Sequence, residues 1–459
     1  MKENVSEVEF EQKAEVGGIH KVLVNRKNET MLLRMQLEEY VHKIANVNFV
    51  ANKFQKHFYG FKQVEQRPNE GTIRDCGHGK IGALNEQQLI AVQRSRQVIS
   101  FLEGPPGTGK TRTLSAIVKA AFLAEEGVIC VGKTNVSVRR LCQVLTKHVP
   151  KRNLGIMVSA EYFEWWHEHL YKGTVLEAVL TKSFEKQIIC MTIDALIVRL
   201  QQGDIPTRWC FEKREPQIWK KRKLLVIEEA SQIWELTAVM LLSLLNWFDR
   251  LVIAGDSKQL QPYVARRHSA GSIMTWASRL RYKIPCTKLL IQYRMVPAIG
   301  SMVSQLFYDG TLVNAMPEDG KKHIFFHDVG GTTIPRGTSC YNPKETEVCL
   351  QIYRKLQTRG NLEAQILTFY KAQELHIKHR CKEAKVCCVD SYQGQEVQAV
   401  VLSLTVRKGA VYSFLSQAER ICVSISRAKY FLHIVGCKRT MIQNDVWARI
   451  IQRCSIIKH

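Results

Sequence analysis

The chain has 14 cysteines, but it lacks a Cys-x-x-Cys pair and lacks any cluster of Cys and His at zinc spacing. The segment RDCGHGK at residues 74–80 offers too few ligands for such a site. This absence argues against a structural zinc module. We interpret the cysteines as reduced core residues of a cytoplasmic or nuclear protein.

Long hydrophobic runs are also missing. The longest, AVMLLSLLNWF at residues 238–248, is well short of the roughly 20 residues that span a bilayer. The first residues, MKENVSEVEFEQK, are charged and show no apolar signal region. We therefore expect neither a membrane span nor a membrane partner.

Acidic residues are scarce relative to basic ones: 42 Asp and Glu stand against 66 Lys and Arg, a formal net charge of +24. Such an excess is typical of proteins with a polyanionic partner, either nucleic acid or an acidic membrane surface. Since no run is long enough for a membrane span, we favour nucleic acid.

The length and composition indicate a soluble protein of two or three domains: 459 residues, 45% hydrophobic and 24% charged. Residues 1–83 are polar and weakly periodic, with one amphipathic helix expected at 30–49 and a linker at 65–82. From residue 84 onward, short β-rich runs alternate with helical stretches. The strands we predict span residues 98–104, 127–133, 187–193, 224–230, 250–256, 286–292, 323–329, 364–370, 385–391, 399–405 and 431–437.

Near-continuous apolar runs of this kind are typical of parallel strands covered by helices on both faces. The sequence therefore predicts an α/β protein with doubly wound sheets. About eleven strands exceed one typical sheet. We expect two sheets, divided near residue 284.

The segment GPPGTGKT at residues 104–111 follows a predicted strand and opens a predicted helix. It matches the phosphate-loop pattern G-x-x-x-x-G-K-[ST] in the required context. Its glycines let backbone N–H groups approach phosphates, and we expect Gly107, Thr108 and Gly109 at the centre of the loop to bind the nucleotide. Lys110 is expected to contact the β- and γ-phosphates, and the Thr111 hydroxyl to bind Mg²⁺.

Two adjacent acids, Glu228 and Glu229, end the strand at residues 224–230, where an ATPase needs acids beside its phosphate loop. Gln259, in AGDSKQLQP, is placed to contact the γ-phosphate or the attacking water. Arg294 and Arg427 lie in the second half of the chain. Phosphoryl transfer requires positive charge on the transferred group, which these arginines would supply.

Together these motifs resemble superfamily 1 helicases of the 1B subclass, the Upf-like family of nonsense-mediated decay and senataxin-type helicases. The resemblance runs from about residue 84 to residue 436. In chain order the matching segments are LNEQQLIAV (84–92, Q motif), GPPGTGKT (104–111, I), GKTNVSVRRL (132–141, Ia), CMT (190–192, Ib), EEASQ (228–232, II), GDSKQLQP (255–262, III), QYRMVPAI (292–299, IV), SCYNPKE (339–345), ILTFYKAQ (366–373), VDSYQGQE (389–396, V) and RICVSISRAK (420–429, VI).

The resemblance implies two RecA-like P-loop lobes, at residues 84–284 and 285–459, behind a short accessory segment at 1–83. It implies a monomeric ATP-dependent helicase or translocase that uses ATP and Mg²⁺. The ATP would lie in the cleft between the lobes, which would close and reopen with each cycle. The partner would be single-stranded nucleic acid, RNA favoured over DNA, with movement from 5′ to 3′.

The resemblance also assigns individual residues. Gln88 would recognise adenine, Tyr293 would stack on it, and Glu396 would lie near the ribose. Glu228 and Thr111 would hold Mg²⁺, and Glu229 would be the general base. The groove that binds the nucleic-acid strand would be lined by Thr134, Asn135, Thr192, Thr368 and Tyr370. Thr and Asn after strands also commonly cap helices, and each of these residues alone fits either role.

The main departure from the family is Glu228, which stands where the family has Asp. Its side chain is one methylene longer, about 1.5 Å of reach, and Mg²⁺ demands near-octahedral geometry. A second hypothesis is therefore an ATP-gated nucleic-acid binding protein with weak or no hydrolysis. A third, a small-molecule kinase, leaves the basic charge and the second-half arginines unexplained.

Overall fold

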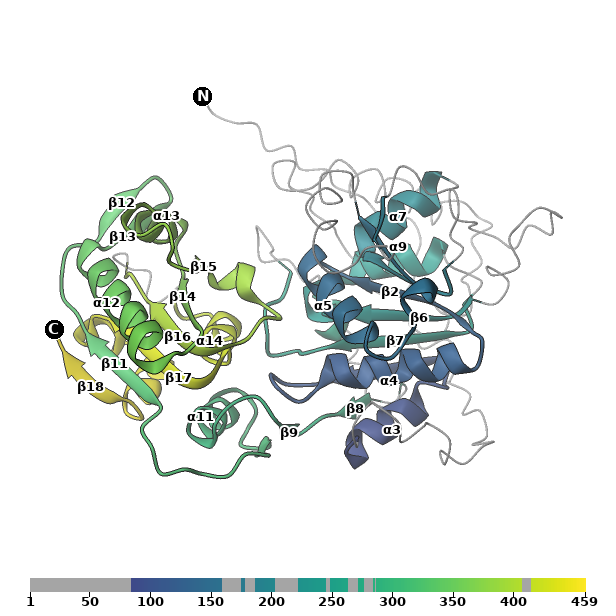
Figure 1. Ribbon diagram of the computed structural model, residues 1–459, viewed down its shortest axis with the longest axis horizontal. Coiled ribbons are helices and arrows are strands. Elements are labelled where there is room, and N and C mark those ends of the chain that lie inside the picture. Colours follow the sequence, from purple (N-terminus) through teal and green to yellow (C-terminus); the bar gives the residue numbers. More distant parts are fainter. Residues whose placement is uncertain are drawn as a thin grey trace, which may run out of the picture. The chain divides into compact units, whose positions relative to one another are not determined.

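The computed structural model describes residues 84–158, 175–177, 186–202, 222–244, 248–262, 271–275, 284, 286–406 and 414–459. The chain divides into two compact units, which are described separately below (Figure 1). Unit 1 takes its residues from Met1–Glu103, Lys110–Ser257 and Gln261–Lys288, and unit 2 from Gly104–Gly109, Lys258–Leu260 and Leu289–His459. The accessory segment expected at 1–83, with its helix and linker, lies outside the described residues.

Unit 1 contains a sheet of eight strands in the order β4-β3-β5-β2-β6-β7-β1-β8. All of its strand pairs are parallel. The strands are β1 (Ile99–Glu103), β2 (Gly127–Gly132), β3 (Leu154–Val158), β4 (Val175–Glu177), β5 (Ile188–Thr192), β6 (Arg222–Glu228), β7 (Arg250–Gly255) and β8 (Cys286–Lys288).

Helices cover both faces of this sheet. They are α3 (Glu86–Arg94), α4 (Lys110–Leu123), α5 (Asn135–Leu145), α7 (Ile193–Gln202) and α9 (Glu235–Leu244), with the short 3₁₀ helices η2 (Lys151–Asn153) and η3 (Ala230–Gln232). Figure 1 shows α3 and α4 on one side and α7 and α9 on the other. The main core lies between the sheet and α7 and α9, where aliphatic side chains such as Ile129, Ile227 and Leu241 are fully buried.

Unit 2 contains a parallel sheet of six strands in the order β15-β14-β16-β17-β11-β18. These strands are β11 (Ile324–Asp328), β14 (Ala364–Thr368), β15 (Val386–Cys388), β16 (Val397–Ser403), β17 (Ala428–Gly436) and β18 (Ser455–Lys458). Two small pairs accompany it: β9 (Ile291–Gln292) with β10 (Val313–Asn314), and β12 (Ile334–Arg336) with β13 (Ser339–Tyr341).

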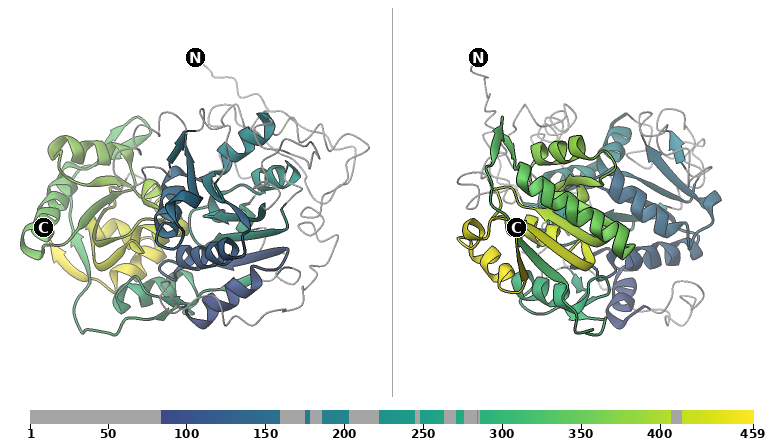
Figure 2. Two further views of the ribbon diagram at one scale, coloured as in Figure 1. Left: turned by 45° about the vertical axis from the view of Figure 1, so that its right-hand side comes forward. Right: turned by 60° about the vertical axis from the view of Figure 1, so that its left-hand side comes forward.

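The helices of unit 2 also pack on both faces of their sheet. They are α11 (Pro297–Phe307), α12 (Pro343–Gly360), α13 (Lys371–Arg380), α14 (Ala418–Ile425), α15 (Lys438–Met441) and α16 (Asp445–Ile451), with η4 (Val389–Tyr392) as a 3₁₀ turn. The right-hand view of Figure 2 shows α12, in green, lying across the strands, in agreement with its contacts to β14, β16 and β17. The Asn342 side chain caps α12 by accepting from the backbone N–H groups of Lys344 and Glu345, and Pro343 begins the helix.

The predicted fold class is confirmed: both units are α/β, with parallel sheets between helices. Each of the eleven predicted strands overlaps an observed one, with two differences. The run at 286–292 breaks at Leu289 and Leu290, because β8 pairs with β1 whereas β9 pairs with β10. The run at 385–391 ends at Cys388, where η4 begins.

Six strands were not predicted. Among them β12 is exposed throughout and β10 has only two residues, so neither carries an apolar run. The strand β3 is fully buried and was missed although its sequence, LGIMV, is apolar. Within the described residues, no helix combines the length and the apolar character needed to cross a membrane.

A buried carboxylate fixes the end of β16. One oxygen of Glu345 accepts hydrogen bonds from the Ser403 hydroxyl (2.8 Å) and from the Thr405 backbone N–H (3.0 Å). Thr405 has φ of +43°, an uncommon conformation for a β-branched residue. Burial raises the pKa of Glu345 to about 7, although the bonds from Ser403 and Thr405 oppose the shift.

We predict a pH-dependent stability that Glu345→Gln removes. The folded pKa of about 7 lies above the ordinary 4.5. The stabilisation is therefore complete below about pH 4.5 and is lost as pH rises through about 7, by about 3 kcal/mol in total. As pH rises from about 5 to about 8, the melting temperature of the variant should rise relative to that of the native chain. A constant difference in melting temperature would contradict this.

Candidate functional site

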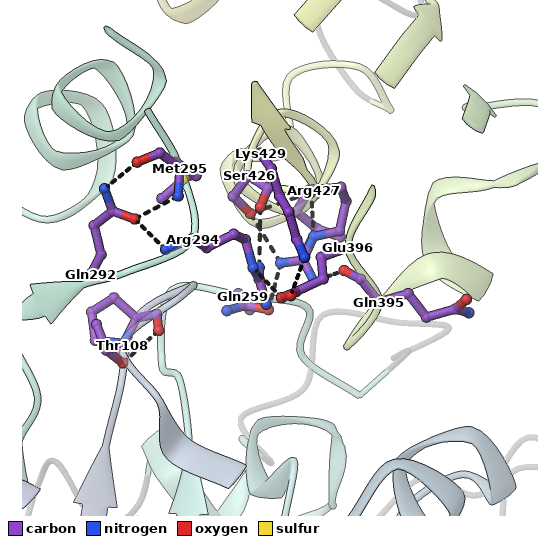
Figure 3. Close-up of polar contacts among 12 residues, drawn as sticks. Thr108, Gln259, Gln292, Arg294, Met295, Gln395, Glu396, Ser426, Arg427 and Lys429 are labelled. Atoms are coloured by element: carbon purple, nitrogen blue, oxygen red, sulfur yellow. Dashed lines mark hydrogen bonds and ion pairs between the residues drawn. The ribbon is translucent and has the colours of Figure 1, made fainter. Parts of the chain in front are cut away.

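The phosphate loop connects the end of β1 to the start of α4 at Lys110. Gly107 and Gly109 have φ of +77° and +86°, which favour glycine. A Cβ added at Gly107 would lie 2.6 Å from the Arg294 Cβ, so this position also has no room for a side chain. The buried Thr108 hydroxyl donates to the Pro105 carbonyl at 2.8 Å and closes the turn (Figure 3).

Thr111 and Glu228 are brought together within unit 1. The Thr111 Oγ1 donates to Glu228 Oε1 at 2.8 Å, and Glu228 is only 3% exposed. The second carboxylate oxygen, Oε2, is buried and has no hydrogen-bond partner. Burial, followed by the charge of Glu229, raises the pKa of Glu228 to about 7. An unpartnered buried oxygen is unfavourable unless a further group satisfies it.

These residues fit a Mg²⁺ ion. Hydroxyl and carboxylate oxygens are the ligands that Mg²⁺ prefers, and one or two carboxylates with nucleotide phosphates suffice for it. Among the described residues, no group of three or more His, Cys, Asp and Glu could hold a metal by itself.

Glu229 adopts the left-handed conformation, with φ of +53°, directly after β6 ends. A non-glycine residue there carries strain of about 1–2 kcal/mol, and such strain is often found at functional sites. The turn continues into η3, where the Gln232 N–H donates to the Glu229 carbonyl at 3.0 Å. As a result, Glu228 is buried while Glu229 is only partly covered.

Gln292, which the sequence did not single out, organises the arginine segment in unit 2. Its side chain is fully buried. Its Oε1 accepts from the N–H groups of Arg294 (3.1 Å) and Met295 (2.8 Å), as Figure 3 shows. Its Nε2 donates to the Met295 carbonyl (2.8 Å) and to Asn314 Oδ1 (2.7 Å). This buried amide therefore fixes the turn that places Tyr293 and Arg294.

Arg294 is held at both ends of its guanidinium. Its Nε donates to Glu396 Oε2 at 2.6 Å, and its Nη1 donates to the Ser426 carbonyl at 3.1 Å. The preceding Tyr293 is 46% exposed, and its backbone N–H donates to the Gly107 carbonyl at 2.9 Å. The phosphate-loop turn and the arginine turn are thus joined within unit 2.

Arg427 is almost fully buried in the same unit. Its guanidinium donates to the carbonyls of Val423 (3.0 Å) and Gln395 (3.1 Å) and to Gln259 Oε1 (3.4 Å). Lys429 lies 3.0 Å from Glu396, which therefore contacts two cations (Figure 3). The family resemblance implies that Glu396 lies near a ribose. Its contacts with Arg294 and Lys429, which the sequence did not indicate, also hold two cations in place.

Gln88 has a structural role in unit 1. It is 2% exposed, and its side-chain oxygen accepts from the Asn85 N–H at 3.2 Å. The Asn85 side chain accepts in turn from the Gln88 N–H at 2.9 Å, which completes a capping box on α3.

The residues expected to line the strand divide into two groups. Thr134 is exposed and caps α5, Asn135 begins α5, and the Thr192 hydroxyl accepts from the Ala195 N–H at 3.2 Å. In unit 2, Thr368 is fully buried, and its hydroxyl donates to the Tyr370 carbonyl at 3.1 Å. Tyr370 is itself buried, at 8% exposure. Thr134 is exposed and Asn135 and Thr192 are half-buried, so these three residues are more accessible than Thr368 and Tyr370.

Comparison with known proteins gives two matches to AAA domain families, at residues 83–275 and 271–439. A regulator of nonsense transcripts 1 homolog from Neurospora crassa is 26% identical over 80% of this chain and 38% of its own length. The ATP-dependent helicase NAM7 of Saccharomyces cerevisiae is 26% identical over 80% of this chain and 43% of its own length. The chain thus spans about two fifths of these relatives.

Two further similarities are more limited. The 5′-3′ DNA helicase ZGRF1 of Mus musculus is 29% identical over 51% of this chain and 14% of its own length. Among solved structures, an arterivirus nonstructural protein 10 (helicase) with DNA aligns with a TM-score of 0.41 and 16% identity, covering 79% of this chain and 65% of that one. The resemblance that the motifs predicted is confirmed by the relatives in sequence.

Proposed function

We propose that this chain, a homologue of the Upf-like superfamily 1 helicases, is an ATP-dependent motor on single-stranded nucleic acid. The proposal favours RNA over DNA and movement from 5′ to 3′. The observation that carries it is the Thr111–Glu228 pair, 2.8 Å apart, with a buried and unpartnered carboxylate oxygen beside the phosphate loop. That pair has the chemistry of a Mg²⁺–nucleotide site.

In this proposal, Lys110 and the loop N–H groups bind the nucleotide phosphates, and Thr111 and Glu228 hold Mg²⁺. A bound Mg²⁺ would neutralise charge on the β- and γ-phosphates. Glu229 orients a water and accepts its proton as that water attacks the γ-phosphorus, while the bond from the γ-phosphorus to the β–γ bridging oxygen breaks and ADP leaves with that oxygen and its electron pair.

Arg294 and Arg427 stabilise charge on the transferred group, and Gln259 contacts that group or the water. Their guanidiniums are already held by fixed acceptors, so little reorganisation is needed during reaction. The acid pair belongs to unit 1 and the arginines belong to unit 2.

The strand would contact the polar groups at the carboxyl ends of β2 and β5, namely Thr134, Asn135 and Thr192. Such groups form hydrogen bonds to phosphate and sugar and contribute affinity without sequence recognition. The net charge of +24 favours a polyanionic strand.

An alternative is a nucleotide-gated binding protein with weak or no hydrolysis. Glu228 motivates it, since its longer side chain is buried and its raised pKa favours the neutral form. Such a protein would bind ATP and change its strand affinity without releasing phosphate.

Steady-state ATP turnover, with and without single-stranded RNA, separates the two proposals. We expect strand-stimulated turnover in the native chain and its loss in Lys110→Ala. A Glu228→Asp variant should stay within about tenfold of native turnover if Glu228 already holds the ion well. Turnover that is absent in the native chain and restored by Glu228→Asp would establish the alternative instead.

A further inference from the structure

The carboxyl ends of β6, β2 and β5 line up along one edge of the unit 1 sheet. In the strand register, Gly132 lies opposite both Glu228 and Thr192. Residues that follow β2 and β5 therefore occupy the same edge as the proposed magnesium ligand. In open parallel sheets, ligands bind at this edge.

An ion pair lies on this edge next to the two strand ends. Lys133 directly follows β2, and Asp194 lies in the first turn of α7. The Lys133 Nζ is 3.0 Å from Asp194 Oδ2, and the two side chains are 34% and 42% exposed. Exposed pairs of this kind are weak and are open to competition from other anions.

Two helix N-termini beside the pair favour a negative group, while Glu228 at the end of the neighbouring strand β6 opposes one. Two helices begin here, α5 after its cap Thr134 and α7 directly after Thr192. Helix N-termini present backbone N–H groups and the positive end of the helix dipole. Within residues 133–135 and 192–194, Asp194 is the one acidic side chain. It contacts the cation that a phosphate would contact.

We propose that Lys133 binds a backbone phosphate of the single strand and that Asp194 occupies Lys133 until a strand displaces it. The inference rests on the proposed function, because it assumes a nucleic-acid partner. It adds a cation to the hydroxyl and amide contacts expected at Thr134, Asn135 and Thr192. It also gives the chain an internal competitor that lowers its affinity for the strand.

Two effects of opposite sign follow. Asp194→Asn frees Lys133 and should tighten binding about two- to fivefold, the range expected for an exposed ion pair. Lys133→Ala removes one phosphate contact, so binding should weaken and the salt dependence should fall by about 0.7 in slope. In the double variant the gain from Asp194→Asn should vanish, because its effect acts through Lys133.

A matched control exists at the opposite edge of the sheet. Lys223, near the start of β6, pairs with Asp249, just before β7, at 2.9 Å and with side chains 43% and 35% exposed. Asp249→Asn makes the same change in net charge on an ion pair of similar geometry. It should leave strand affinity within about 1.5-fold of the native value, the effect of net charge alone at moderate salt.

The experiment measures binding of a fluorescent oligouridylate to the full chain without nucleotide, across a salt titration, for all five proteins. Melting temperatures confirm that each variant is folded. Tighter binding in Asp194→Asn but not in Asp249→Asn supports the inference. Equal effects of the two Asp variants, or unchanged binding in Lys133→Ala, overturn it while leaving the proposed function intact. A native chain that binds no strand overturns both.

Discussion

Replacing Glu229 by Gln should lower strand-stimulated ATP turnover by about 10²- to 10⁴-fold, the usual contribution of a general base. ATP affinity should change little, because the Mg²⁺ ligands and the phosphate loop are untouched. Gln matches Glu in shape, so the left-handed turn with φ of +53° is retained. The measurement is kcat together with the dissociation constant for ATP in both proteins.

The reason for so large an effect is the local geometry. Because β6 ends at Glu228 and Glu229 turns into the left-handed region, the two carboxylates have different environments. One is buried against the Thr111 hydroxyl, and the other is only partly covered. Glu235→Gln, six positions later in the first turn of α9, makes the same charge change and serves as the control. Native-like turnover in Glu229→Gln would remove this residue from the mechanism.

Replacing Arg294 by Lys should lower kcat by about 10³-fold or more, the range measured when an arginine finger is missing. A lysine keeps the charge but lacks the planar fork. It cannot reproduce both the 2.6 Å bond to Glu396 and the 3.1 Å bond to the Ser426 carbonyl. We expect the loss in kcat with little change in strand affinity, since Arg294 lies outside the residues proposed to contact the strand.

A surface arginine provides the comparison. Arg336 lies in the exposed strand β12 of the same unit, and Arg336→Lys should leave kcat unchanged. A loss of ATP affinity in Arg294→Lys with kcat unchanged would indicate a contact made equally in the ground state and the transition state. A native kcat together with a native ATP affinity would remove Arg294 from the mechanism.

Much of the site could be predicted because motifs fix residue type and spacing. The strand–loop–helix pattern and the acid-ended strand were enough to expect an acid beside the phosphate loop, although not the bond itself, which joins Thr111 and Glu228 across 117 positions. Parallel strands with continuous apolar runs were likewise recognisable. These features depend on local sequence and on the general rule that such strands end at one edge of a sheet.

Other features depend on tertiary packing and leave little trace in the sequence. Gln292 is the last residue of the two-residue strand β9, and nothing local shows that it is buried and makes four hydrogen bonds. The contact of Glu396 with Arg294 joins segments 102 positions apart through side chains alone. At Thr134 the sequence was ambiguous for a different reason. Helix capping and nucleic-acid binding favour the same residue type, so the sequence alone could not choose between the two roles.

Displacement of a streptavidin block from single-stranded RNA tests most directly whether the chain is an ATP-driven motor. We predict that ATP speeds release of streptavidin from a biotin at the 3′ end, and that neither a non-hydrolysable ATP analogue nor the Lys110→Ala variant does so. Strand binding that responds to ATP, without release of streptavidin from either end and without release of phosphate, would contradict a motor and identify a nucleotide-gated binding protein.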